Sequence, residues 1–197
     1  MQPSEKFARA IELIDAANAE DPQTIVVDGI ELPKEPTHAR LLTEWVERLN
    51  PDASEQLLLA ARAMHIRRWT SSRQSYPADR KGYLRWRTEL KKMHQEQAGL
   101  LMEQAGYDAA AIARVQQLIS KANRQQDPEV QTLEDGLCLV FLQTQLSDLA
   151  ARLDDEKMIG ILRKSWAKMS PAAHYLAHDL PFDDRSRDLV GRALAPD

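Results

Sequence analysis

The chain has 197 residues, of which 43% are hydrophobic and 28% charged, and its net charge is −4. This length suits one compact domain, which would bury roughly 70% of the surface that its unfolded form exposes. No run of about 18 apolar residues is present to cross a membrane, and the first residues lack the profile of a secretory signal. Cys138 is the single cysteine, which excludes an internal disulfide and fits a reducing compartment. We therefore expect a cytoplasmic protein.

Helical periodicity dominates the first third of the chain, with one interruption. A first helix is predicted to begin after Pro3-Ser4 and to end near Asp21-Pro22. The stretch TIVVDGIEL predicts a short β-hairpin near residues 24–32, with its turn at Asp28-Gly29. After the breaker-rich loop LPKEP, further helices are expected over the ranges His38 to about Leu49 and Glu55 to about Trp69.

The rest of the chain is also predicted to be helical. The longest irregular stretch is SSRQSYPADRKGY, and loops of this length are often functional. The helices expected after it run from Leu84 to about Ala105, from Asp108 to about Lys121, and from Gln131 to about Leu153. Two or three shorter helices end the chain, with breaks at Ser170-Pro171 and Pro181. These patterns predict a single all-α domain over residues 1–197.

The charge is unevenly distributed along the chain. The segment from Arg62 to Lys92 holds ten Lys or Arg residues and two acids, a charge of +8, so the remainder carries −12. A basic segment in an acidic protein is a candidate for holding phosphate, carboxylate or nucleic acid. A solvated face that meets acids elsewhere on the surface is the alternative explanation.

Three histidines lie on three different predicted helices, and an acidic pair follows them. His38, His65 and His94 precede Glu134-Asp135, which opens an apolar helix. An unpaired buried carboxylate is costly, and a metal ion shared with imidazoles across a helical bundle would stabilise it. The three histidines and this acidic pair are therefore candidates for a site that binds a divalent metal ion.

Structural explanations remain open for the same residues. A buried histidine is often only a hydrogen-bonded packing residue, and acids are favoured near a helix N-terminus without any metal. His174 and His178 stand four residues apart on one helix face, but nothing nearby completes a ligand set. These two histidines are expected at the surface.

The order of these elements resembles the HD superfamily of metal-dependent phosphohydrolases. The resemblance covers about Thr37 to Leu149, an HD-like core of about 37–149 followed by C-terminal helices over 150–197. It is carried by four stretches of sequence: THARLLTEWV, LAARAMHIRRW, HQEQAGLLMEQAGYDAAAIARVQQLI and LEDGLCLVFL. It implies a helical bundle in which the three histidines and Asp135 hold the metal.

The chain departs from the HD pattern at two positions. Ile66 stands where the family has the aspartate of its His-Asp pair, and Lys121 stands where a further histidine is often found. The resemblance then implies one metal ion rather than two, with the Lys121 ammonium in the role of the second. Glu134 is the candidate base or support for a ligand histidine.

The chain also resembles an uncharacterised family, the domain of unknown function numbered four-two-zero-two. The shared phrases HIRRW, YPADRKGYLRWR, LEDGLCLVFL and KSWAKMS span nearly the whole chain. Some members carry a glutamyl-tRNA synthetase label, and two short segments of this chain superficially resemble the synthetase signatures. Those signatures hold ATP at the edge of a parallel β-sheet, which this sequence does not encode. We therefore exclude synthetase activity.

The function expected from these features is hydrolysis of a phosphorylated small molecule or nucleotide. One divalent ion (Mn, Fe, Mg, Ni or Zn) would activate water, while arginines gather the phosphate and aromatic rings stack on the substrate. The expected substrate-binding residues are Arg67, Arg68, Arg73, Arg80, Lys81, Tyr83 and Trp86.

The alternative is a catalytically degenerate HD-like protein. It would bind a nucleotide, RNA or an acidic partner through the basic segment 62–92. RNA is not favoured, because the whole chain is acidic and carries no motif of a known RNA-binding module. A third possibility, the iron oxygenase chemistry of some HD-like bundles, has no feature that favours it over hydrolysis.

Overall fold

The computed structural model describes residues 4–27 and 29–195. Within these residues the chain forms ten α-helices and one two-stranded antiparallel hairpin, which confirms the predicted all-α class. No helix in the described part of the chain is both long enough and apolar enough to cross a bilayer.

The helices are α1 (Glu5–Asn18), α2 (Lys34–Leu49), α3 (Glu55–Ala63), α4 (Arg80–Gln104), α5 (Ala109–Ser120), α6 (Pro128–Thr144), α7 (Leu146–Arg152), α8 (Asp155–Trp166), α9 (Pro171–Ala177) and α10 (Asp184–Leu194). The strands are β1 (Thr24–Val27) and β2 (Ile30–Pro33). Thr24 pairs with Pro33 and Val27 with Ile30. The hairpin thus lies where the sequence predicts it; Gly29 of its turn has φ +78°, and Asp28 lies outside the described residues.

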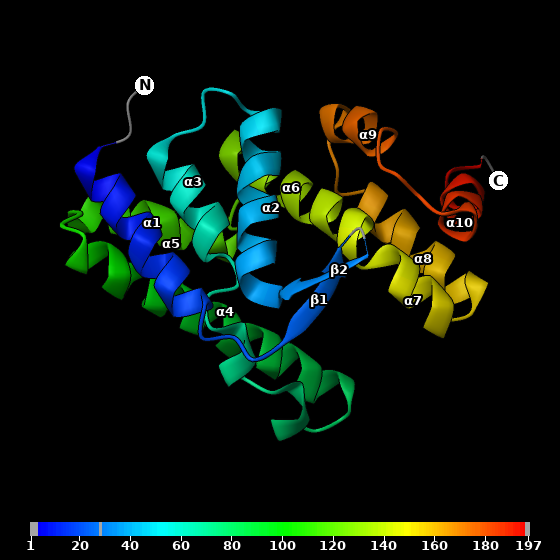
Figure 1. Ribbon diagram of the computed structural model, residues 1–197, viewed down its shortest axis with the longest axis horizontal. Helices are drawn as coiled ribbons and strands as arrows, with labels where there is room; N and C mark the ends of the chain where they lie inside the picture. Colours follow the sequence, from blue (N-terminus) through cyan, green and yellow to red (C-terminus); the bar gives the residue numbers. More distant parts are fainter. Residues whose placement is uncertain (1–3, 28, 196–197) are drawn as a thin grey trace.

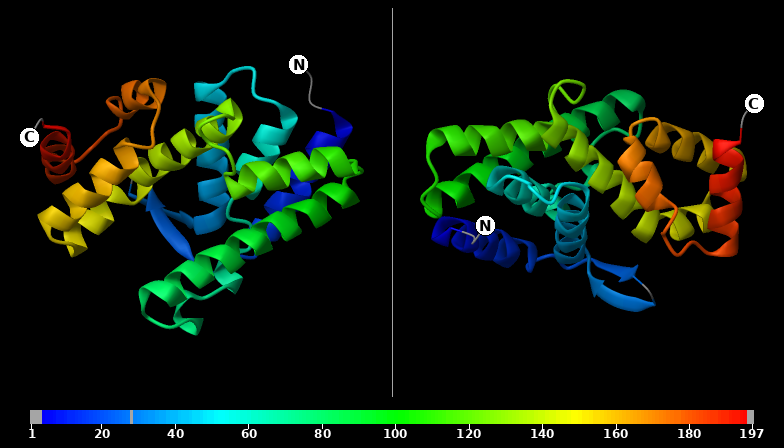
Figure 2. Two further views of the ribbon diagram at one scale, coloured as in Figure 1. Left: turned by 180° about the vertical axis from the view of Figure 1, so that it is seen from behind. Right: turned by 90° about the horizontal axis from the view of Figure 1, so that it is seen from above.

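Helix α2 stands at the centre of the molecule (Figure 1). It packs against α3 on one side and against α6 on another, while α4 and α5 form an antiparallel pair that contacts α3. Helices α1 and α10 lie at opposite ends in all three views, and α7 to α10 gather at the end away from α1 (Figures 1 and 2). The bundle built around α2 and α6 therefore joins an N-terminal group of helices to a C-terminal group.

Side-chain caps define most helix starts in the described part of the chain. The hydroxyls of Ser4, Ser54 and Ser170 and the carboxylate of Asp108 each accept a hydrogen bond from a backbone N–H in the first turn of the following helix. Gly106, with φ +89°, follows the end of α4 in the left-handed conformation that its lack of a side chain permits.

The predicted start of α2 at His38 is wrong, because the helix begins four residues earlier at Lys34. Pro36 lies in its first turn, where the missing N–H would have no helical partner. The loop predicted for LPKEP is therefore partly helical. As a consequence, Glu35 lies one turn before His38 on the same helix.

Three other predicted boundaries also differ. Helix α3 ends at Ala63 rather than near Trp69, and Arg67 adopts a left-handed φ of 51° before a 3-10 turn at Arg68–Thr70. Helix α4 begins at Arg80 rather than Leu84, because the Asp79 carboxylate caps it. The predicted helix from Gln131 to Leu153 is two helices, since Gln145 leaves the helical conformation (φ −125°, ψ −17°).

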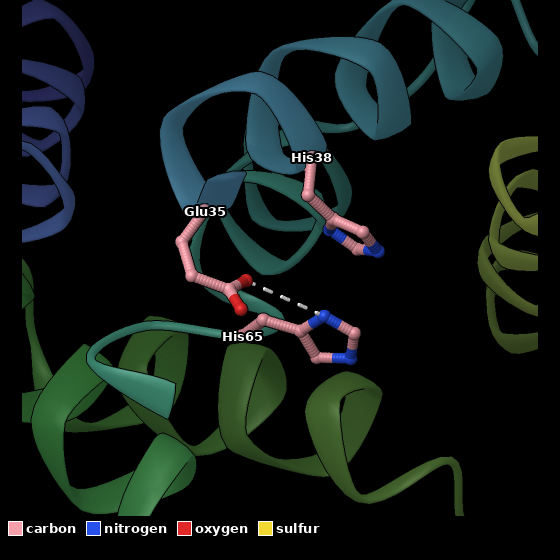
Figure 3. Close-up of side chains that lie close together, drawn as sticks. All are labelled: Glu35, His38 and His65. Atoms are coloured by element: carbon pink, nitrogen blue, oxygen red, sulfur yellow. Dashed lines mark ion pairs between the residues drawn. The ribbon is translucent and has the colours of Figure 1, made fainter. Parts of the chain in front are cut away.

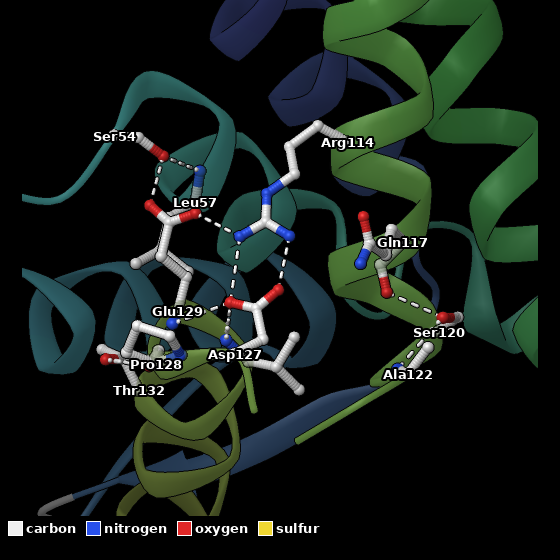
Figure 4. A network of polar contacts seen from close by, with 11 residues as sticks. Ser54, Leu57, Arg114, Gln117, Ser120, Ala122, Asp127, Pro128, Glu129 and Thr132 are labelled. Carbon is white, nitrogen blue, oxygen red and sulfur yellow. Dashed lines mark hydrogen bonds and ion pairs between the residues drawn. The ribbon is translucent and has the colours of Figure 1, made fainter. Parts of the chain in front are cut away.

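One ion-pair network ties the junction of three helices (Figure 4). Arg114 of α5 donates to both carboxylate oxygens of Asp127, at 2.5 and 3.0 Å, and to Glu129 at 2.6 Å. Asp127 also caps α6, and Glu129 accepts a hydrogen bond from Ser54, the cap of α3. The guanidinium beside Asp127 lowers the pKa of that carboxyl below its ordinary value of 3.8.

Replacing Arg114 with Met is expected to lower the free energy of unfolding by about 1–3 kcal/mol at pH 7, because partly buried charged hydrogen bonds are lost. The lowered pKa of Asp127 means that this stabilisation is present above pH 3.8 and disappears as the pH falls through the folded value. Urea unfolding of both proteins at pH 7 and pH 3 measures it. A gap of equal size at both pH values would contradict the ion-pair explanation.

Candidate metal and anion site

A cavity of about 690 Å³ lies between the helices. Its walls come from α2, the segment after α3, α4, the end of α5, α6 and the segment around the end of α8. This volume lies within the range of sites for small molecules.

The three predicted histidines lie together at this cavity. His38 lies on α2, His65 follows α3, and His94 is on α4, and all three line the cavity. The rings of His38 and His65 stack with their centroids 4.1 Å apart, and those of His65 and His94 are 5.8 Å apart. The fold therefore brings together imidazoles that are separated by 56 residues of sequence.

Glu35 joins this cluster, and the sequence analysis missed it. Figure 3 shows Glu35 and His38 projecting from the start of α2 toward His65. A carboxylate oxygen of Glu35 lies 3.7 Å from Nδ1 of His65, and one ligand atom from each of the three residues lies within 4.8 Å of the others. The Glu-x-x-His spacing, one helical turn, was the signal that could have identified this residue.

The cluster leaves buried polar atoms without partners. Oε2 of Glu35, Nδ1 of His38 and Nε2 of His94 make no hydrogen bond with any of the described residues, although buried polar groups are nearly always satisfied. Two ligand atoms of one tetrahedral zinc ion lie about 3.3 Å apart. The distance between Oε2 of Glu35 and Nδ1 of His65, 3.7 Å, is close to this value. The donor set therefore fits a divalent cation.

Burial also keeps the imidazoles neutral, the form in which they bind metals. Burial, together with the charge of the Arg68 guanidinium, lowers the pKa of His38 from 6.5 to about 4 and that of His94 to about 3. Burial likewise places the pKa of His65 well below its ordinary value. Desolvation has the opposite effect on Glu35 and raises the pKa of its carboxyl to about 7.

Five cationic side chains line the cavity: Arg68, Arg87, Lys91, Lys121 and Lys168. Among the lining residues in the described part of the chain, Glu134 is the only acidic one. Arg68 lies with its guanidinium carbon 5.2 Å from the centre of the Trp86 ring, and its partial burial lowers its pKa. The lining is therefore strongly positive, as a site for an anionic molecule requires.

Most of the substrate-binding residues predicted from sequence lie elsewhere. Arg68 and Tyr83 line the cavity, whereas Arg67, Arg73, Arg80, Lys81 and Trp86 are not part of its lining. Arg67 reaches Glu20 at 3.4 Å, and Arg73 donates to the carbonyls of Tyr76 and Pro77.

Asp135, expected as the carboxylate ligand, is not among the cavity-lining residues. Its Oδ1 accepts hydrogen bonds from the side chain of Gln131 and from the backbone N–H of Ser170, both at 2.8 Å. Its neighbour Glu134 faces the cavity and pairs with Lys121 at 2.8 Å and Lys168 at 3.4 Å. Glu35 does not line the cavity either, but its carboxylate oxygen lies 3.7 Å from Nδ1 of His65, so it is the carboxylate beside the imidazoles.

The C-terminal histidines form a separate aromatic group. The ring of His174 stacks on Trp166 at 4.2 Å, and His178 meets the same indole edge-on at 5.9 Å. His178 is exposed.

Replacing Glu35 with Gln is expected to stabilise the metal-free protein at pH 8 and to change it little at pH 5. The raised pKa means that folding takes up a proton between pH 4.5 and 7, so the wild type loses stability as the pH rises through this window. The neutral amide avoids this loss, on the order of 3 kcal/mol. Urea unfolding with excess chelator at both pH values measures the difference. Destabilisation of the variant at pH 8 would show that the charged carboxylate has a partner in the protein.

Comparison with known proteins identifies a family. No curated protein and no solved structure matches the chain. The family described as "Domain of unknown function (DUF4202)" matches residues 8–190. Because the match covers nearly the whole chain, the protein belongs to the DUF4202 family.

Proposed function

We propose that this protein is a metal-dependent hydrolase of a phosphorylated small molecule. The observation that supports the proposal is the convergence of Glu35, His38 and His65, whose ligand atoms lie within 4.8 Å of one another, with two of these side chains unsatisfied. Arg68 and Arg87, which line the same cavity as His38 and His65, would bind the phosphate.

The side chains take distinct parts in the proposed site. Glu35, His38 and His65 hold the ion, and His94, with its unpartnered Nε2, is the available fourth donor. A bound divalent ion would supply a Lewis acid that makes water a nucleophile near neutral pH. Two or more imidazoles with one carboxylate favour Zn, Fe, Mn or Ni over Mg, which prefers oxygen ligands.

Arg68 and Arg87 would hold the phosphate beside the ion. Both line the cavity, both influence His94 electrostatically, and neither has an ion pair with a carboxylate among the described residues. A guanidinium presents parallel N–H groups that match two phosphate oxygens. The Lys121 and Lys168 ammonium groups lower the pKa of Glu134 despite its burial, so Glu134 would be a weak base at neutral pH. We therefore assign Glu134 to positioning these lysines.

Membership of the HD superfamily is part of this proposal. Ile66, at the place of the missing aspartate, is fully buried in the core, so no carboxylate enters the site from that position. Glu35 supports the proposal because it offers a carboxylate one helical turn before the first histidine. The ligand set would then be a variant of the HD arrangement with one metal ion.

A catalytically inactive binding protein is the alternative, favoured by that missing aspartate. Docking of RNA on the basic segment has less support. Arg62 pairs with Asp15, Arg85 with Glu89 and Lys92 with Glu96. Three more of its cations, Arg68, Arg87 and Lys91, line the cavity rather than forming a continuous outer face.

Metal content tests the proposal directly. Native protein is expected to contain about one divalent ion per chain by elemental analysis. His65→Ala is expected to lose this ion, and the exposed His178→Ala is the matched control that retains it. The metal-loaded wild type is expected to release phosphate from members of a panel of phosphomonoesters.

Two results would count against parts of the proposal. Metal-free native protein whose melting temperature does not respond to added Zn, Mn, Fe or Ni would exclude the metal site. A metal-loaded protein that binds phosphate esters without turnover would support the inactive binding protein instead.

A further inference from the structure

Four of the cationic side chains of the cavity form two groups on different walls. One group, the arginine end, consists of Arg68, from the turn after α3, and Arg87, from α4. Lys91 of α4 belongs to neither group, because its ammonium donates to the carbonyl of Ser120 at the end of α5. The other, the lysine end, consists of Lys121 after α5 and Lys168 after α8, with Glu134 of α6 between them. A single phosphate at the metal requires only the first group.

The charges at the lysine end do not cancel. Two ammonium groups share the carboxylate of Glu134, so one positive charge is left over. Lys121 makes the closer contact, at 2.8 Å, and its side chain is 28% exposed. Lys168 lies at 3.4 Å and is 52% exposed, so its ammonium is the one available to a further anion.

The backbone that carries Lys168 is fixed in place. Its carbonyl accepts hydrogen bonds from Arg124 at 3.0 Å and from Gln131 at 2.8 Å. Two residues later, the N–H of Ser170 donates to the buried Asp135. Asp135, the carboxylate that the metal cluster does not use, thus holds the segment that presents Lys168, and a fixed donor binds with a smaller entropy loss.

Apolar side chains line the cavity as well. They include Leu90, Leu137, Cys138 and Phe141. A cavity of about 690 Å³ is several times larger than a phosphate ion needs. The space therefore suits a molecule with a short carbon skeleton and an anionic group at each end.

We propose that the lysine end is a second anion subsite, which binds a carboxylate of the same molecule whose phosphate lies at the arginine end. The substrate class is then the phosphate monoesters of small organic acids. One uncompensated positive charge matches a carboxylate, whereas the two guanidinium groups of the arginine end match the double charge of a phosphate monoester. This inference rests on the proposed phosphate site, but it does not require turnover.

A matched pair of phosphonates tests the subsite without hydrolysis. 3-Phosphonopropionate and 3-hydroxypropylphosphonate have the same length and differ in a carboxylate against a hydroxymethyl group. Calorimetry on the full-length, metal-loaded protein is expected to show about 10-fold tighter binding of the carboxylate compound. Lys168→Met is expected to reduce this ratio to about 2 or less while the affinity for the hydroxyl compound stays the same.

Other variants separate the two ends of the cavity. Lys164→Met replaces an exposed lysine of α8 that does not line the cavity, and it should leave the ratio unchanged. Arg87→Met should weaken both phosphonates about equally. Equal affinity of the wild type for the two compounds would overturn the carboxylate subsite alone. Failure of both compounds to bind would overturn the phosphate site, and the subsite with it.

Discussion

The candidate site depends on a carboxylate and two imidazoles buried without partners. Glu35, His38 and His94 each keep a buried atom that makes no hydrogen bond within the protein. Leaving such a group unsatisfied costs about 1–3 kcal/mol, and three together are a large fraction of the stability of a domain. A cation held by Glu35, His38 and His65, whose ligand atoms lie within 4.8 Å of one another, would satisfy two of these atoms and would balance the carboxylate. The strongest argument for a ligand is therefore that these buried atoms have no hydrogen-bond partner among the described residues.

The sequence predicted the helices well where a local side chain defines their ends. The helices expected from Glu55 and from Asp108 begin at Glu55 and Ala109, where Ser54 and Asp108 cap them, and the helix expected to end near Ala105 ends at Gln104. The start of α2 was missed because proline was interpreted as a helix breaker, although the first helical turn accepts it. That error concealed Glu35, since a residue assigned to a loop has no predicted relation to His38.

The site was predictable only in part, for a related reason. Histidines on different helices gave a correct expectation that three of them meet, because an unusual polar residue on an apolar helix face needs a partner. Asp135 is also a polar residue on an apolar helix, but its partners are Gln131 and the backbone N–H of Ser170 rather than a metal ligand set. Ser170 lies 35 residues after Asp135, so the sequence pattern could not predict this hydrogen bond. Adjacent residues on a helix point about 100° apart, which is why Glu134 faces the cavity while Asp135 does not.

Two unusual backbone conformations beside the cavity support the view that the residues lining it have a function. Arg67 and Lys121 both have positive φ, at 51° and 55°, a conformation that non-glycine residues rarely adopt. Each such residue costs on the order of 1 kcal/mol and persists where surrounding structure imposes it. Arg67 lies between His65 and Arg68, and the turn there allows both neighbours to line the same cavity. Lys121 ends α5 at the place where glycine is usually favoured, and its ammonium pairs with Glu134. Selection for stability alone would favour glycine at both positions. The lysine at position 121 is therefore best explained by the positive charge that it places beside Glu134 in the cavity.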